Sequence, residues 1–573
     1  MAAIDTPSIF EGQHAKLCDY PNKPLGEFKS SITVAVVGAG FTGLLAARSL
    51  AMCGAKVDLY ERNSRPAGRA QSRLLAPNIT TNLGPMRHGD GYGALKRTIE
   101  YFGFTFGKEF ENPGVVPTAV IYDGLVYNPS DKDNLPWQIK DALKGWKVVE
   151  TQGFEVNGRK YPSLDQLRNW LRIEDMRERL EKHEEFERFV VDFEPFSLQQ
   201  FLELVFVTND TPPNEKNWTN DTINAFASYS FKNGNIVPFL DLGCMWFLKS
   251  SINGCDANQV NFCEINADGS RSLGDYQRFC DKLVEEARAK GASLFMDTEV
   301  SYVHRHNRAH DLANYTLYGK NQGGNIKKCY NEIVFAIPPP ALTKIIDNGK
   351  GLPETIYPNP ICDAIRNMHM INAFKIEWLV SKQPFIEDPT LVRCLQMPDT
   401  LGQVYILECN SHRFLKAMVY TWGDKADNIA AHRPADMYEY AIACIEKEFH
   451  GTSVEPMIPC YKKVEGIGRV EQVNWKDNQS SQGAVAYPLP GQDRYGQRIL
   501  KLFVEGNMPL IAGTGYYDDD WWKYCDRNSQ LATISLIKRH KGVIFNKDVS
   551  ELNGLEKGFY RYYDEFMSDK ILK

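Results

Sequence analysis

Three glycines near the start of the chain have the spacing of a phosphate-binding turn. Gly38, Gly40 and Gly43 follow a short run of valine and alanine that is typical of a buried parallel strand, and a helical apolar pattern comes after them. The first glycine permits a tight turn, the second lets the backbone approach a pyrophosphate, and the third packs helix on strand. Glu61 ends the next strand pattern, where an acceptor for a ribose hydroxyl is needed. This motif predicts a dinucleotide site, and the acid favours FAD or NAD over NADP.

Further strand and helix patterns would position such a site. Residues 167–188 are rich in charge, with apolar residues at helical spacing, and predict an exposed amphipathic helix. The other expected strands are 56–61, 293–303, 332–337, 375–380, 417–420 and 508–513, and the other expected helices are 272–290, 436–449 and 529–538.

Length and composition limit the class of protein. The 573 residues are enough for two or more domains, and 43% hydrophobic with 24% charged residues is typical of a folded chain. The net charge of -6 gives no basic excess for nucleic acid or an anionic membrane. We therefore expect a small-molecule partner.

Cysteine usage and hydropathy bear on the compartment. The 13 cysteines form neither a CxxC pair nor a Cys/His metal spacing, so we expect reduced thiols and no metal site. Residues 1–30 lack the apolar core of a secretory signal, and no apolar run long enough for a membrane helix occurs. The expectation is a cytoplasmic protein without a membrane partner.

A series of short motifs continues beyond the glycine turn and Glu61. Gly68-Arg69 comes next, and Gly84-Pro85-Met86-Arg87 follows it. This order resembles the flavin-containing amine oxidase family. The likeness continues at 298–300, 335–339, 372–375, 420–422, 475 with 483–484, and 510–513.

Within that family the chain is most similar to L-amino acid oxidases and to tryptophan and phenylalanine 2-monooxygenases. The matching segments are 111–118, Tyr420-Thr421-Trp422 and the stretch around Lys375, and the resemblance spans residues 33 to 545. It implies FAD as the cofactor. An NAD-dependent dehydrogenase is disfavoured, because the flavin-type segment at Ala512-Gly513 would then have no purpose.

The resemblance also implies an α/β fold in which a discontinuous Rossmann-like FAD-binding domain is joined to an α+β substrate domain with a helical insertion. The expected FAD-binding domain comprises 31–115, 265–345 and 485–545. The expected substrate domain comprises 116–264, with the insertion at about 130–235, and 346–484; residues 1–30 and 546–573 are expected to be terminal extensions.

The implied cofactor contacts are spread over these separated segments, with Val300 placed where the family's backbone meets adenine. The full set is Gly38, Gly40, Gly43, Glu61, Arg62, Gly68, Arg69, Pro85, Met86, Arg87, Val300, Gly513 and Trp522.

Three residues are expected to act on the substrate. Arg87 offers a planar fork that suits a carboxylate better than a lysine point charge does. By resemblance, Lys375 holds a water near flavin N5, and Trp522 forms one aromatic wall of the substrate pocket. Trp475 and Tyr487 are candidates for other walls, with core packing as the alternative.

The chain departs from the family pattern in two places. The usual Trp-x-Glu-Gly-Ala reads Trp522-Lys-Tyr-Cys-Asp, which leaves the flavin contacts at that end open. His88 replaces the usual Phe after Arg87, so it is a candidate substrate-binding residue that tunes protonation or, equally, an ordinary loop histidine. Asp518, Asp519 and Asp520 select a cationic side chain or form an exposed acidic turn.

The functional hypothesis is an enzyme that oxidises the α-amine of an L-amino acid, with hydride passing from Cα to flavin N5 and O2 as electron acceptor. The products are an imino or 2-oxo acid with peroxide or, by oxidative decarboxylation, the amide. The alternatives are an oxidase of an amine or tailored amino acid, and a degenerate flavin-binding protein. The expected assembly is a homodimer.

Overall fold

A five-stranded parallel sheet is assembled from four separate parts of the chain. In this computed structural model its order is β14 (Ser293–Phe295), β3 (Lys56–Tyr60), β2 (Thr33–Val37), β18 (Glu332–Phe335) and β26 (Leu510–Ile511). The structure describes residues 22–89, 93–170, 176–229, 235–252, 259–306, 314–349, 356–397, 401–500, 502, 508–516 and 522–545. The strands are short, and most of their side chains are apolar because both faces of a parallel sheet are buried.

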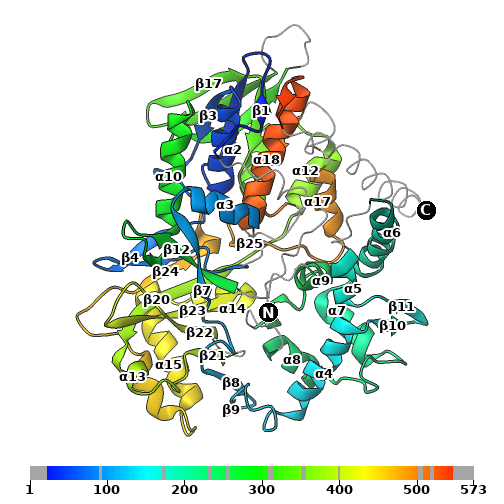
Figure 1. Ribbon diagram of the computed structural model, residues 1–573, viewed down its shortest axis with the longest axis vertical. Coiled ribbons are helices and arrows are strands. Elements are labelled where there is room, and N and C mark those ends of the chain that lie inside the picture. Colours follow the sequence, from blue (N-terminus) through cyan, green and yellow to red (C-terminus); the bar gives the residue numbers. More distant parts are fainter. Residues whose placement is uncertain are drawn as a thin grey trace.

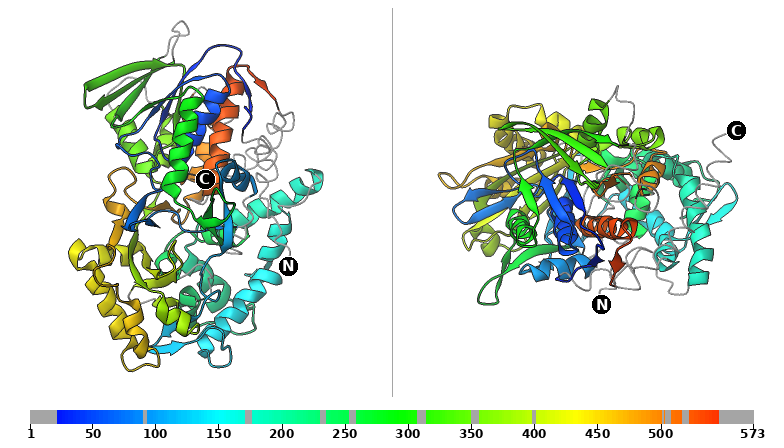
Figure 2. Two further views of the ribbon diagram at one scale, coloured as in Figure 1. Left: turned by 60° about the vertical axis from the view of Figure 1, so that its left-hand side comes forward. Right: turned by 90° about the horizontal axis from the view of Figure 1, so that it is seen from above.

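Three helices that are far apart in sequence cover one face of this sheet. They are α2 (Phe41–Met52), α10 (Tyr276–Ala289) and α18 (Trp522–Arg539), and they lie side by side in the upper half of Figures 1 and 2. An antiparallel sheet of β15 (Glu299–Arg305), β16 (Tyr315–Asn321) and β17 (Gly324–Tyr330) adds Leu317 and Tyr330 to the same core.

A seven-stranded sheet forms the lower left of Figure 1, with helix α15 (Met437–Phe449) packed on it. Along β20, Phe374, Ile376 and Trp378 enter the core shared with α15, so the alternating Lys375 and Glu377 point to the other face. The strand order is β24 (Glu471–Asn474), β20 (Ala373–Ser381), β23 (Phe414–Trp422), β22 (Gly402–Leu407), β21 (Cys394–Met397), β8 (Thr118–Tyr122) and β9 (Leu125–Tyr127).

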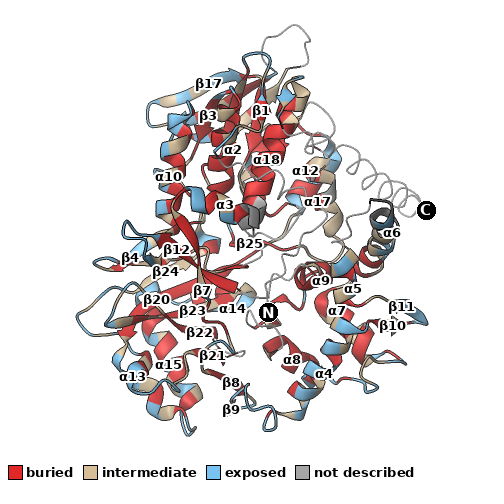
Figure 3. Cartoon of the chain, viewed as in Figure 1, coloured by how far each residue is buried: buried red, intermediate tan, exposed pale blue. Residues whose placement is uncertain are grey.

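A helical region at the lower right of Figure 1 has its own aromatic core, which includes Trp146, Phe193, Phe201, Trp218 and Trp246. Figure 3 shows the buried residues of these helices in red. The helices are α4 (Trp137–Thr151), α5 (Leu164–Trp170), α6 (Met176–Phe193), α7 (Leu198–Leu202) continuing into the π-helix Glu203–Val207, α8 (Asn220–Tyr229) and α9 (Cys244–Ile252).

The remaining elements connect these layers. Among them, β12 (Gln259–Ile265) pairs with β6 (His88–Gly89), β7 (Phe104–Glu109) and β13 (Arg271–Leu273). The others are β1 (Gly26–Glu27), β4 (Ser72–Ala76), β5 (Ile79–Asn82), α3 (Gly93–Tyr101), β10 (Phe154–Val156), β11 (Arg159–Tyr161), 3₁₀ turn Val237–Phe239, α11 (Pro339–Asn348), α12 (Asn359–Arg366), β19 (Met370–Ile371), α13 (Gln383–Glu387), α14 (Gly423–Ala430), 3₁₀ turns Pro434–Asp436 and Glu455–Met457, α16 (Ile458–Tyr461), 3₁₀ turn Trp475–Asp477, β25 (Val485–Ala486), α17 (Asp493–Leu500) and β27 (Val543–Ile544).

The α/β fold expected from sequence is confirmed, and the element boundaries differ most at three places. The strand expected at 293–303 is two strands in different sheets, β14 and β15, because Asp297 turns the chain with a φ of 49°. The helix expected at 167–188 is divided between α5 and α6, and 171–175 lie outside the described residues. The last helix begins at Trp522 rather than 529. The proposed division into domains stays a prediction.

None of the helices in the described ranges is long and apolar enough to cross a lipid bilayer. The same ranges contain no group of three or more His, Cys, Asp or Glu side chains arranged to hold a metal ion.

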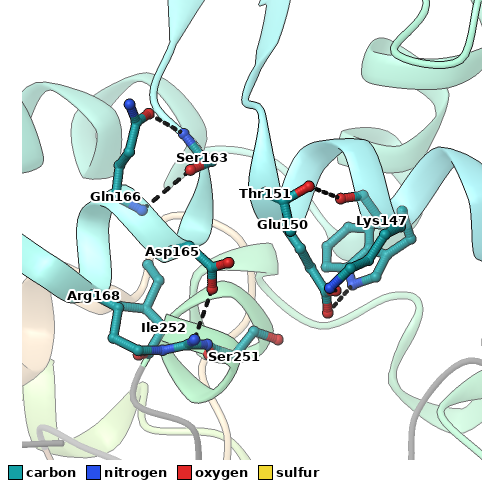
Figure 4. Close-up of polar contacts among 10 residues, drawn as sticks. Lys147, Glu150, Thr151, Ser163, Asp165, Gln166, Arg168, Ser251 and Ile252 are labelled. Atoms are coloured by element: carbon teal, nitrogen blue, oxygen red, sulfur yellow. Dashed lines mark hydrogen bonds and ion pairs between the residues drawn. The ribbon is translucent and has the colours of Figure 1, made fainter.

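Within the helical region, hydrogen bonds join helix α5 to helix α9, and Figure 4 shows the residues involved. A reciprocal capping box starts α5: Ser163 N donates to Gln166 Oε1 at 2.9 Å, and Gln166 N donates to Ser163 Oγ at 3.1 Å. Arg168 then donates from Nε to Ile252 O at 2.9 Å and from Nη2 to Ser251 O at 2.6 Å. These are the last carbonyls of α9, where a cation is favoured by the helix dipole.

We expect Arg168→Ala to lower the free energy of unfolding by about 1–2 kcal/mol, because two charge-assisted hydrogen bonds at a helix end are lost. Urea titration of the purified protein would measure the change. The matched control is Lys147→Ala in α4, which removes an exposed ion pair to Glu150 and should change stability by less than about 0.5 kcal/mol. Equal effects of the two substitutions would contradict this account of α9.

Candidate active site

One long cavity of about 860 Å³ runs from the parallel sheet to the seven-stranded sheet. Its volume lies in the upper part of the range of about 300–1,000 Å³ that is usual for ligand and cofactor pockets. Most of the residues predicted to bind the cofactor line it, namely Gly38, Gly40, Glu61, Arg62, Gly68, Arg69, Pro85, Met86, Arg87, Val300 and Gly513. The predicted substrate residues His88, Trp475 and Tyr487 also reach the lining.

The glycine turn has the geometry that a pyrophosphate requires. Gly38 has a φ of 101°, and a Cβ on Gly43 would lie 1.8 Å from Gly38 O, so α2 packs directly against the turn. A Cβ on Gly40 would meet no atom within 4 Å, because Gly40 faces the open cavity. Gly40 also precedes the first turn of α2, whose dipole attracts an anion.

Glu61 is held beside this turn by three hydrogen bonds. Its Oε2 accepts from Ala39 N at 2.9 Å, and its Oε1 accepts from Asn63 N at 2.9 Å and from Asn63 Nδ2 at 2.8 Å. The carboxylate is buried and borders the cavity. Together with the space at Gly40, it fits the sugar and diphosphate of a dinucleotide.

Close backbone contacts connect the cavity's separate segments. A Cβ on Gly84 would lie 1.8 Å from Arg69 O, and one on Gly513 would lie 2.8 Å from Ile337 O. Arg69 itself donates to the carbonyl of Ala484, and its Nη2 donates to Thr514 Oγ1 at 3.2 Å. Segments distant in sequence therefore meet where the two sheets approach the cavity.

Lys375 is almost completely buried, with 1% of its surface exposed. Its Nζ donates to Gly84 O at 2.6 Å and lies 4.6 Å from the centre of the Tyr420 ring. Burial lowers the pKa of Lys375 to about 7, against a smaller opposing effect of Glu377. Lys375 lies between Gly84 and Tyr420, which both line the cavity, and is not itself among the described lining residues, so its catalytic role stays a prediction.

Glu377 lies two residues along the same face of β20 and is fully buried. Its Oε2 accepts from Lys416 Nζ at 2.9 Å and from the Thr81 hydroxyl, while its Oε1 has no hydrogen-bond partner within the described part of the chain. The positive charges of Lys416 and Arg87 also lower the pKa of Lys375 and so oppose the effect of this carboxylate.

Among the described residues, neutral side chains hold Arg87 at the wall of the cavity. Its Nη1 donates to Asn112 Oδ1 at 2.5 Å and to Tyr405 Oη at 3.3 Å, and its guanidinium lies 5.7 Å from the centre of the Phe110 ring. Asn112 donates in turn to Gln259 Oε1 at 2.9 Å. Asn112 belongs to the 111–118 motif, so that motif contains the signal for an arginine-orienting residue that the sequence reasoning did not single out.

His88 reaches the cavity lining, but its ring lies in an aromatic cluster. The ring stacks on Phe106 at 5.3 Å between centroids, packs against Phe262, and its Nε2 is 2.8 Å from Tyr276 Oη. Burial lowers the pKa of His88 to about 3, so the ring stays neutral. His88 lies in strand β6 rather than in a loop, and its side chain packs toward β12 and α10, while its role in substrate binding stays a prediction.

Aromatic rings enclose one end of the cavity. Tyr487 stacks on Trp246 with centroids 4.6 Å apart, and Phe239 lies 5.7 Å from Tyr487 and 5.6 Å from Trp422. Trp475 is also buried here. Trp246 and Phe239 were not predicted, although the aromatic-rich stretch 237–247 was a usable signal. The side chain of Trp522 and residues Asp518 to Asp520 lie outside the described residues.

The fold and this cavity define a flavin-dependent oxidoreductase, and the comparisons agree. The chain belongs to the flavin containing amine oxidoreductase family, whose sequence pattern matches residues 41–507. It is an enzyme of the amine oxidase type, and its cofactor is FAD.

Two similar proteins are tryptophan 2-monooxygenases. The protein from Pantoea agglomerans pv. gypsophilae is 21% identical over 551 residues, which cover 93% of this chain and 94% of that protein. The protein from Pseudomonas savastanoi is 23% identical, with 84% of each chain covered. An L-amino-acid oxidase from Daboia russelii is 39% identical over 83 residues, 14% of this chain and 16% of its own.

Solved structures with the same fold include a putrescine oxidase variant and the cyclohexylamine oxidase of Brevibacterium oxydans IH-35A. Each superposes with a TM-score of 0.60 at 14% identity, covering 89% of this chain and all of the other. At this identity the likeness concerns the fold.

Two glycine substitutions should separate cofactor binding from folding. Gly40→Ala adds a methyl group to the open cradle, so we expect at least about tenfold weaker FAD binding and an apoprotein stability within about 1 kcal/mol of wild type. Gly43→Ala forces a Cβ against Gly38 O and should cost at least about 2 kcal/mol of stability. Flavin titration and urea unfolding would measure both. Normal FAD affinity in Gly40→Ala would argue against pyrophosphate binding at the glycine turn.

The lowered pKa of Lys375 predicts a pH-dependent stability. Between pH 7 and pH 10 the unfolded lysine binds a proton that the folded one has lost, so the stability of the wild type rises with pH. Lys375→Met should therefore be more thermostable than wild type at pH 7, with an advantage that shrinks toward pH 10. Melting temperatures across this range would show it. Lys447→Met on α15 controls for loss of an exposed lysine, and a constant advantage of Lys375→Met would contradict the lowered pKa.

Proposed function

We propose that this enzyme oxidises the α-amine of an L-amino acid whose side chain is aromatic or large and apolar. The observation that carries the proposal is the placement of the Arg87 guanidinium at the wall of a cavity enclosed by Trp246, Trp422 and Tyr487. The curated relatives named as tryptophan 2-monooxygenases support this substrate class.

Arg87 would fix the carboxylate of the substrate. A guanidinium makes two parallel, charge-assisted hydrogen bonds to a carboxylate, which orients the bound molecule as well as attracting it. Asn112 and Tyr405 hold Nη1 from the side, so the fork is oriented before a substrate arrives. An amine without a carboxylate would lose this orientation.

The aromatic rings would hold the side chain and exclude water. Stacked and edge-on contacts such as those among Phe239, Trp246 and Tyr487 favour a planar apolar group. The carboxylate and the side chain would together fix Cα above the cofactor.

When bound, FAD supplies a two-electron acceptor for the hydride of Cα, and O2 takes up those electrons. Lys375 would hold a water at the reacting centre and exchange a proton with it, since its pKa of about 7 allows both protonation states. In one outcome O2 would be reduced to H2O2 and the released imino acid would hydrolyse to a 2-oxo acid and ammonia. In the other, O2 would be consumed with the bound intermediate to give the amide, CO2 and water.

Anaerobic mixing with a panel of L-amino acids and their decarboxylated amines tests this proposal. We expect L-tryptophan or L-phenylalanine to bleach the flavin absorbance, and tryptamine and phenethylamine to do so at least about 100-fold more slowly. Arg87→Met should raise KM for the amino acid about 100-fold and leave the slow reaction with the amines nearly unchanged. Faster bleaching by the amines would overturn the assignment, and analysis of the aerobic products would distinguish amide from 2-oxo acid.

A further inference from the structure

Strand register places four polar side chains in one row across the seven-stranded sheet. Gln396 on β21 is opposite Gln403 on β22, Gln403 is opposite Tyr420 on β23, and Tyr420 is opposite Lys375 on β20. Residues directly opposite each other in neighbouring strands point to the same face. Gln403 therefore projects on the face of the sheet that carries the buried Lys375.

Gln403 reaches the cavity with an amide that is only partly used. It is 4% exposed and lines the cavity beside Tyr420. Its Oε1 accepts from the Tyr405 hydroxyl, whereas its Nε2 has no hydrogen-bond partner among the residues that the structure describes. A buried donor left without an acceptor costs free energy, so such a group in an active site points to a ligand.

Tyr405 connects this amide to Arg87. Its hydroxyl donates to Gln403 Oε1 and accepts from Arg87 Nη1 at 3.3 Å. With its oxygen engaged in this way, the amide is oriented so that the NH2 group is left for the cavity. Tyr405 acts here as a positioning residue.

We propose that Gln403 Nε2 donates a hydrogen bond to the substrate carboxylate beside Arg87, and so is a specificity-determining residue for α-amino acids. This inference rests on the proposed function. An amide nitrogen only donates, so its partner must be an acceptor, and the carboxylate is the acceptor-rich group of an amino acid. The chain from Arg87 through Tyr405 to Gln403 places this donor next to the expected carboxylate site.

Gln396 provides a matched control. It is a buried glutamine on the same face, opposite Gln403, and its Nε2 is likewise without a partner in the described ranges. Of these two, Gln403 is among the described residues that line the cavity and Gln396 is not. Substitution of Gln396 therefore removes a comparable buried amide one strand away from the proposed contact.

The test uses flavin-loaded enzyme and two probes, indole-3-acetate and the neutral indole-3-acetamide, with binding followed by calorimetry and by the change in flavin absorbance. We expect wild type to prefer the acid. Gln403→Met should weaken binding of the acid about tenfold and that of the amide less than about twofold. Gln403→Glu should weaken the acid further, because two carboxylates would face each other. Gln396→Met should change both affinities by less than about twofold.

Two outcomes would contradict these ideas, and they separate the role of Gln403 from the proposed function. If wild type prefers the acid, Arg87→Met removes the preference and Gln403→Met retains it, the role of Gln403 is wrong and the proposed function stands. If wild type shows no preference for the acid, the carboxylate clamp and the proposed function are both wrong. Flavin content and melting temperature verify folding, and the nearly isosteric Gln403→Glu keeps the test decisive if Gln403→Met folds poorly.

Discussion

The two-residue alternation of strand β20 in the seven-stranded sheet is the constraint on which the site depends. Phe374, Ile376 and Trp378 enter a hydrophobic core with α15, and this burial fixes the register of β20. Lys375 and Glu377 are then forced to the opposite face, where each is almost fully buried. A slip by one residue would exchange a lysine and a glutamate with three large apolar side chains, so the apolar core specifies the position of the reactive face.

The cofactor end depends on a different physical device, which is close approach of backbones. Three contacts leave no room for a side chain, at Gly43 on Gly38, at Gly84 on Arg69 and at Gly513 on Ile337. The contact at Gly513 joins two distant parts of the chain, whereas the contacts at Gly43 and Gly84 pack nearby turns of the amino-terminal segment against each other. Because these contacts are steric, they set where the walls of the cavity lie before any cofactor contributes binding energy.

The sequence predicts the features that local spacing determines. The glycine turn, Glu61 and the order of the motifs led to the α/β fold and to a set of cofactor residues most of which line the cavity, since each motif carries its geometry within a few residues. His88 shows the limit of this approach. Its surroundings are decided by the pairing of β6 with β12 and by Tyr276 on α10, nearly 190 positions away. Gln403 was not predicted for the same reason, because only strand register brings it to the cavity.

The helical region supplies one wall of the pocket. Trp246 belongs both to the aromatic core of that region and to the stack with Tyr487, so the packing of α9 determines where the ring lies. Arg168 on α5 fixes the carboxyl end of α9. The pocket therefore combines a polar floor set by strand register with an aromatic wall set by helix packing. The helical region and the seven-stranded sheet have separate cores. Substitutions in the helical region can therefore alter which substrate side chains are preferred while Arg87 and Lys375 keep their positions.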